Sequence, residues 1–233
     1  RSFEEILTLL ERMRRSGDGW VFKGARGYLR DGGPVQDSPA AHDLISRALG
    51  GDAANPLYVV AVGAVTNVAS AILMAPEIIS NIVVVWLGGH AYHWPNTREF
   101  NLHQDIPAAR VIFDSGVPLM QIPCMGVCSH LHTTVPEIET HVRGRGPIGD
   151  YLADIFGNFS KEHFAWSKVL WDISAVAWLV NPSWVPSNLV HSPIVTDQAT
   201  WSMDTGRHLI RCANYVRRDE IFRDLFAKLG SDS

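Results

Sequence analysis

Residues 57–67, LYVVAVGAVTN, join an apolar run to a turn and the start of a helix. The run 57–62 is rich in β-branched side chains and carries no charge, so it predicts a strand that is covered on both faces. Gly63 predicts a tight turn, and Thr66 or Asn67 is expected to cap a helix that continues through Met74. This order of strand, turn and helix is typical of an α/β sheet.

The same pattern recurs further along the chain. Residues 82–87 form a second apolar run before Gly88-Gly89, and residues 118–123 form a third. Asp105 is expected to cap the helix between them, which continues through Phe113. Three buried strands with helices between them predict an α/β fold with a mostly parallel, Rossmann-like open sheet and helices on both faces.

Helical patterns dominate both ends of the chain. Phe3, Ile6, Leu7 and Leu10 recur at helical spacing and predict a first helix with one buried face. After Thr134 the patterns at 147–164, 173–180 and 219–229 predict a helical C-terminal part. No linker or internal repeat divides the chain, so we expect a single domain over residues 1–233.

The composition excludes several classes of protein. The 233 residues are 46% hydrophobic and 19% charged, which is enough apolar material for a full core. The net charge of −4 argues against a nucleic-acid-binding surface. Three cysteines and the absence of a signal pattern predict a cytoplasmic protein. Residues 59–76 are uncharged, but their strand-turn-helix punctuation argues against a membrane span, and we expect no membrane partner.

Polar residues that follow the predicted strands are the candidates for a site, because ligands of parallel α/β sheets bind beyond the carboxyl ends of the strands. Glu99 and Asn101 lie in the long loop after the second strand. If that loop is extended, both side chains point to one side and could hold two neighbouring hydroxyls. A solvated loop is the alternative for both residues.

Asp172 stands alone within the apolar run 170–173. A buried carboxylate needs a partner, so three possibilities stay open: it caps a helix through the amide near Ala175, it pairs with a cation, or it binds a metal. A competing zinc site would use side chains whose types suit that metal, namely His90, His93, His103, Cys124, Cys128, His130 and His132.

Several of these segments together resemble the inosine/uridine-preferring nucleoside hydrolase family. The resemblance runs from about Pro56 to the C-terminus and rests on residues 62–67, 87–89, 99–101 with Asp105, and 171–172. The Glu-Phe-Asn segment at 99–101 is its most specific part. The resemblance implies hydrolysis of the N-glycosidic bond of ribonucleosides to free base and ribose, in a homo-oligomer, dimer or tetramer.

The resemblance also implies a Ca2+ cofactor and a role for each site residue. Asp172 and the backbone carbonyl of Val62 would be calcium ligands. Glu99 and Asn101 would hold ribose hydroxyls, with Asn96 as a looser candidate in the same loop.

Two departures from the family pattern alter these expectations. Trp171 stands where many members carry a histidine, so it would stack on the leaving base and favour purines, while His93, His103 and His163 remain alternative acids. The family's first strand and its aspartate cluster, which carries the general base, are absent from the chain. We therefore expect a weak or inactive hydrolase when the chain stands alone. The alternatives are a non-catalytic riboside-binding pseudoenzyme and a zinc-binding protein.

Overall fold

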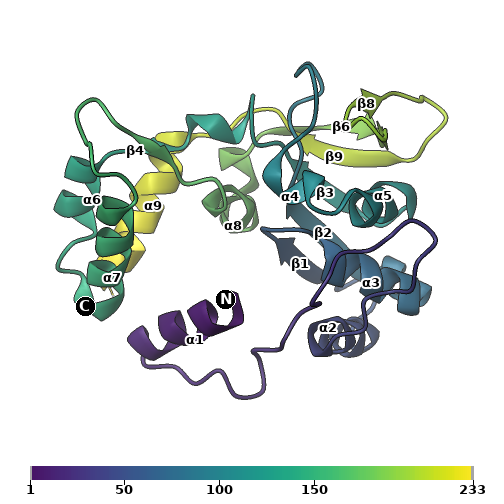
Figure 1. Cartoon of the computed structure of the whole chain (residues 1–233), viewed down its shortest axis with the longest axis horizontal. Coiled ribbons are helices and arrows are strands. Elements are labelled where there is room, and N and C mark those ends of the chain that lie inside the picture. The colour runs from purple at the N-terminus through teal and green to yellow at the C-terminus, as the bar shows by residue number, and fades with distance from the viewer. Residues whose placement is uncertain (1, 232–233) are drawn as a thin grey trace.

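The computed structural model describes residues 2–231 and is built around a five-stranded sheet (Figure 1). Its strands follow the spatial order β1 (Leu57–Ala61), β2 (Ile82–Leu87), β3 (Leu119–Ile122), β9 (Leu209–Ala213) and β6 (Ser187–His191). The first four run parallel and β6 is antiparallel to β9. The predicted α/β class with a mostly parallel sheet is confirmed.

The register of the sheet explains why β2 is apolar throughout. Val59, Val84 and Leu119 form one row across β1, β2 and β3, and they belong to the core on one face. The next row, which contains Val85 and Met120, belongs to the core on the other face. Successive side chains of a strand alternate between the two faces of the sheet. Every position of a strand that is covered on both faces is therefore buried and favours an apolar side chain.

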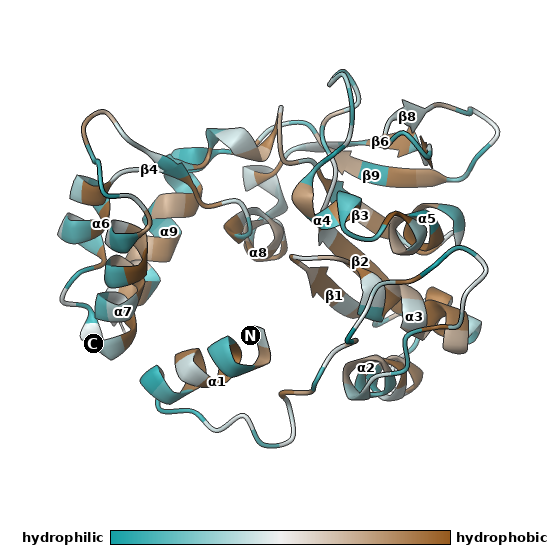
Figure 2. Ribbon diagram, in the orientation of Figure 1, coloured by the Kyte–Doolittle hydropathy of each residue, from teal (hydrophilic) through white to brown (hydrophobic). Residues whose placement is uncertain are grey.

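Helices cover the two faces unequally. The face of the first row carries α2 (Pro39–Leu49), α3 (Thr66–Met74) and α5 (Ile106–Asp114). The opposite face carries the short, apolar α8 (Ile173–Val180), which packs against β1 and β2. Figure 2 shows the hydrophobic colour gathered on β1, β2 and α8.

The remaining elements are short or lie at the periphery. A helical layer is formed by α6 (Val135–His141), α7 (Gly146–Asn158) and α9 (Arg218–Ser231), and it stands apart from the sheet (Figure 1). Two small antiparallel pairs join β4 (His132–Thr133) to β5 (Lys168–Val169) and β7 (Ile194–Val195) to β8 (Trp201–Ser202). The other segments are α1 (Ser2–Arg12), α4 (Phe100–His103) and the 3-10 turns at Pro76–Asn81, Cys128–His130 and Pro182–Trp184.

The first helix is present, but the expectation that it buries an apolar face is wrong. None of its residues is buried, and Ile6 is 44% exposed. The helix instead meets α7 through polar groups: the Tyr151 hydroxyl donates to the Glu5 carboxylate at 2.8 Å, and the Arg12 guanidinium lies 4.0 Å from the Tyr151 ring centroid. The apolar side of α1 thus remains largely open.

The caps of two helices were predicted with unequal success. Asp105 caps α5 as expected, because its Oδ1 accepts from the amide of Ala108 at 3.0 Å. Neither Thr66 nor Asn67 caps α3, whose N-cap position is occupied by Val65. The hydroxyl of Thr66 donates to Asp105, and the Oδ1 of Asn67 accepts from the amide of Ala25 at 2.8 Å. Both side chains therefore bond to residues far away in the sequence and do not cap α3.

The uncharged segment 59–76 is the end of β1, a turn and α3. Within residues 2–231, no helix has the length and apolar composition that a membrane crossing requires.

Candidate active site

A cavity of about 700 Å3 opens at the carboxyl ends of β1 and β2. Val62 follows β1, Leu87 ends β2, and Cys124 follows β3. The walls gather most of the residues that the sequence singled out, and they consist of Val62, Leu87, His90, Arg98, Glu99, Phe100, Asn101, Cys124, Met125, Phe159, Lys168, Trp171 and Asp172. The position agrees with the rule that ligands of parallel sheets bind beyond the strand ends.

Glu99 is a buried carboxylate held by backbone amides. It is 6% exposed and occupies the N-cap position of α4. Its Oε1 accepts from the amide of Asn101 at 2.8 Å, and its Oε2 accepts from Leu102 and Gly89, both at 3.0 Å. An ionised carboxylate offers about four acceptor positions. Backbone amides use three of them here, and the thiol of Cys124 lies against the same carboxylate.

Gly89 permits this arrangement because it has a positive φ of 76°. A Cβ at this position would lie 2.6 Å from Cζ2 of Trp201 and 2.7 Å from Oγ1 of Thr97. Only glycine combines that backbone conformation with so close an approach. The amide of Gly89 is thereby brought to the Glu99 carboxylate.

Asn101 also lines the cavity, but not by the expected geometry. We predicted that Glu99 and Asn101 lie on one side of an extended segment, whereas Asn101 lies within α4. Its Nδ2 donates to the carbonyl of Leu87 at 3.0 Å, and the residue is 7% exposed. The end of β2 therefore fixes the amide group of Asn101 in the cavity wall.

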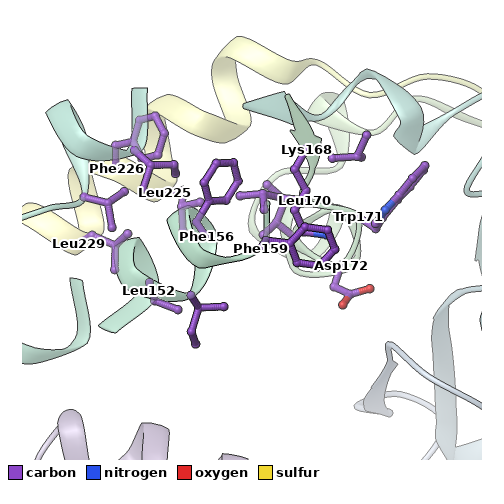
Figure 3. Close-up of a pocket in the computed structure, with 15 residues that line it drawn as sticks. Leu152, Phe156, Phe159, Lys168, Leu170, Trp171, Asp172, Leu225, Phe226 and Leu229 are labelled. Atoms are coloured by element: carbon purple, nitrogen blue, oxygen red, sulfur yellow. The ribbon is translucent and has the colours of Figure 1, made fainter. Parts of the chain in front are cut away.

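Asp172 occupies the N-cap position of α8, yet its side chain makes no cap hydrogen bond. Of the three possibilities left open by the sequence, capping is therefore wrong. Figure 3 shows its carboxylate pointing away from the neighbouring apolar side chains. Partial burial raises the pKa of Asp172, and the nearby charge of Glu99 raises it further. The Asp172 carboxylate is thus available for chemistry in the cavity.

The other predicted residues are placed as follows. Val62 is 45% exposed in the wall, and the adjacent turn is fixed by the Trp86 indole, which donates to the carbonyl of Gly63 at 3.1 Å. Trp171 lies beside Asp172 in the wall. Asn96 is not among the lining residues, and its Oδ1 accepts from the amide of Arg98 at 3.0 Å. Its role as a ribose ligand stays a prediction.

His90 was considered only as a zinc ligand from the sequence, yet it is part of the cavity wall. Its Nδ1 accepts from the amide of Met125 at 3.3 Å, and burial lowers its pKa although the charge of Glu99 partly offsets this effect. The alternative acids His93, His103 and His163 do not line the cavity. The available signal was the position of His90 directly after Gly88-Gly89, at a strand end.

Phe159 and Lys168 were missed as well. Both line the cavity, and the Lys168 Nζ lies 3.4 Å from the centroid of the Phe159 ring. Nothing in their local sequence marks them, because Phe159 follows α7 and Lys168 belongs to β5.

The zinc hypothesis fails on geometry. Across residues 2–231, no three His, Cys, Asp or Glu side chains converge as a metal-binding group. Cys124 and Cys128 are buried, burial raises the pKa of both thiols, and the Cys128 thiol donates to Oγ of Ser174 at 3.2 Å. Zinc is bound by thiolates, and burial disfavours that charged form of both cysteines.

The cavity offers oxygen atoms, the ligand type that a hard cation prefers, but too few of them to complete its coordination. The Asp172 carboxylate and the Val62 carbonyl are oxygen donors in one cavity, whereas three backbone amides already occupy Glu99. Calcium takes about six to eight oxygen ligands. The part of the chain that the structure describes therefore holds only a fraction of such a site.

Comparison with known proteins adds the family context. A family model described as "Inosine-uridine preferring nucleoside hydrolase" matches residues 11–221. A putative pyrimidine-specific ribonucleoside hydrolase, RihB, from Shigella boydii is 33% identical over 133 residues, which are 54% of this chain and 54% of the relative. RihB from Escherichia coli O1:K1 / APEC is 32% identical over 133 residues, which are 54% of this chain and 42% of that protein. The chain thus aligns with about half the length of the curated relatives it matches.

Solved structures share the fold. An "Inosine-Guanosine Nucleoside Hydrolase" superposes with a TM-score of 0.74 at 20% identity, covering 99% of this chain and 84% of that one. A purine-preferring ribonucleoside hydrolase from Gardnerella vaginalis gives a TM-score of 0.70 at 24% identity, covering 84% of this chain and 66% of that one.

Proposed function

The chain belongs to the inosine-uridine preferring nucleoside hydrolase family, and on that premise we propose that it hydrolyses the N-glycosidic bond of ribonucleosides to free base and ribose. The observation that carries the proposal is the Asp172 carboxylate, which caps nothing and shares one cavity with Glu99, Asn101 and Trp171. Within this cavity, the Asp172 carboxylate would act on a sugar whose hydroxyls are held by Glu99 and Asn101.

Each residue receives a role from its chemistry. The Glu99 carboxylate would accept a hydrogen bond from one ribose hydroxyl, and Asn101 would offer the rest of its amide group to a second hydroxyl. Trp171 supplies an aromatic face for the leaving base but has no proton to give at neutral pH, so the base takes its proton from water. A larger ring overlaps more of the indole, and on this ground we propose a preference for purines.

We propose calcium as the cofactor, with Asp172 and the Val62 carbonyl among its ligands. Both are oxygen donors, which this hard ion prefers over nitrogen and sulfur. When bound, such an ion would hold the attacking water and the ribose hydroxyls. The remaining oxygen ligands would come from water, from substrate or from protein outside residues 2–231.

The experiment is an assay of base and ribose release from inosine, guanosine and uridine by the natural full-length protein that carries these residues. Asp172→Asn should reduce kcat/KM by about 100-fold or more, as is usual when one preorganised electrostatic group is lost. Asp18→Asn removes a carboxylate outside the cavity and serves as the control. Full activity of Asp172→Asn contradicts the proposal.

A second candidate function is riboside binding without turnover, which the short set of oxygen ligands in residues 2–231 favours. Calorimetry with inosine, followed by a product assay on the same sample, separates the two functions. Binding heat without free base supports the second candidate, and binding heat with free base supports the hydrolase.

A further inference from the structure

A positively charged side chain lies where the candidate active site meets a second cavity. The second cavity has a volume of about 410 Å3 and shares Phe159, Lys168, Trp171 and Asp172 with the first. Figure 3 shows these four residues at one end of the second cavity, while Leu225, Phe226 and Leu229 lie at the other end.

Lys168 is fixed in place from two directions. Its backbone is paired in β5, where it lies opposite Thr133 of β4. Its Nζ is held over the Phe159 ring, 3.4 Å from the centroid. Across residues 2–231, no carboxylate lies within ion-pairing distance of this ammonium group, although Asp172 lines the same cavity. The cation is thus preorganised, and its hydrogen-bond donors remain free for a ligand.

We propose that Lys168 is a specificity-determining residue that donates a hydrogen bond from Nζ to a carbonyl oxygen of the leaving base, an inference that rests on the hydrolase function proposed above. A lysine ammonium has three donors and no acceptor. It therefore matches the oxo group of hypoxanthine and does not match the amino group of adenine, which is itself a donor. The preferred substrates are 6-oxopurine ribosides.

The same contact would act on the reaction itself. When the bond between C1′ and the base nitrogen breaks, its electron pair stays with the base, and the negative charge spreads to the carbonyl oxygen. The water that forms the new bond to C1′ releases one proton and the base gains one, so the step balances without a further reactant. Lys168 stabilises the negative charge on the departing base, which Trp171 cannot protonate.

The test compares Lys168→Met with Lys168→Arg in the natural full-length protein. Two quantities are measured: the ratio of kcat/KM for inosine over adenosine, and the ratio of the calorimetric Kd for adenine over the Kd for hypoxanthine. The unsubstituted protein should favour the oxo compound, and Lys168→Met should lower both ratios by about 10-fold, the usual size of one charged hydrogen bond. Lys168→Arg keeps the charge and the donors, so it should retain most of the preference.

Lys161→Met is the matched control, because Lys161 lies outside both cavities. Far-ultraviolet circular dichroism checks that every variant is folded. Unchanged ratios in Lys168→Met, or an equal loss for both bases, would overturn the role of Lys168. If the unsubstituted protein neither binds a base nor hydrolyses a nucleoside, the proposed function itself fails, and this outcome is distinct from the first.

Discussion

The Glu99 carboxylate accepts a hydrogen bond from the backbone amide of Gly89 at 3.0 Å, which joins the end of β2 to the start of α4. This contact assembles the side of the cavity that we propose to hold ribose. Gly89 belongs to the glycine pair after β2, and Glu99 is the N-cap of α4. Both residues are therefore also required by the fold.

Glu99→Gln should lower the free energy of unfolding by about 1–3 kcal/mol, because an amide nitrogen would face a backbone donor that the carboxylate now satisfies. Urea denaturation at neutral pH measures the loss. Glu11→Gln, on the exposed side of α1, is the control. A change in Glu99→Gln of less than about 0.5 kcal/mol, the range of ordinary surface substitutions, would show that the amide contacts do not stabilise the fold.

Asp105 connects three distant segments and should be equally sensitive. It is 1% exposed, caps α5 through Ala108, accepts from the amide of Leu29 at 3.1 Å and receives the hydroxyl of Thr66. Asp105→Ala should cost about 2–4 kcal/mol, since it removes a cap and leaves buried donors without partners. Thermal unfolding followed by circular dichroism should show the drop in Tm. Asp52→Ala, in an exposed turn, should shift the Tm much less.

The ion pair between Glu137 and Arg218 should make the free energy of unfolding depend on pH in the acidic range. Burial alone would raise the pKa of Glu137, but hydrogen bonds from Arg218 and Thr133 lower it overall. A lowered pKa in the folded state means that the stabilisation is complete above the ordinary value of 4.5 and is lost as the pH falls through the folded pKa. The difference in unfolding free energy between wild type and Glu137→Gln should be below about 1 kcal/mol at pH 7, because the pair is partly exposed. It should shrink toward pH 3, and a constant difference from pH 7 to pH 3 would contradict this prediction.

The cysteines should be unreactive while the protein is folded. Cys124, Cys128 and Cys212 are buried, and burial raises the pKa of each thiol. A colorimetric thiol assay with an aromatic disulfide at pH 8 should therefore detect almost no thiol in the native protein. In denaturant it should detect 3 thiols per chain. Rapid modification of the native protein would show that the walls around Cys124 open in solution.

An exposed apolar surface beside α8 bears on the expected homo-oligomer. Leu189 is 60% exposed and Leu209 is 53% exposed on the sheet face that carries α8. We expect this surface to be covered by a second copy of the chain, because monomers rarely expose contiguous apolar patches. Leu189→Lys should shift the species seen by sedimentation velocity toward the monomer. Leu49→Lys, a 51% exposed position on α2, should not.

The sheet could be predicted because the residues that build it have no alternative environment. Val84 and Val85 lie in opposite cores, so β2 must be apolar at every position, and such a run is visible in the sequence alone. The same holds for Asp172, whose isolation within an apolar run already required an explanation. Local patterns are informative where burial leaves few choices.

Residues positioned by distant parts of the chain could not be found in this way. Lys168 reaches the cavity because β5 pairs with β4. Thr66 does not cap α3, because its hydroxyl donates to Asp105. Both relationships join segments more than 30 residues apart. No periodicity or spacing encodes them.

The proposed site is best examined in a crystal structure of the natural full-length protein with calcium and ribose. We predict an ion in contact with the Asp172 carboxylate and the Val62 carbonyl, and ribose hydroxyls on Glu99 and Asn101. An ion and a sugar bound outside the cavity that these four residues line would contradict it.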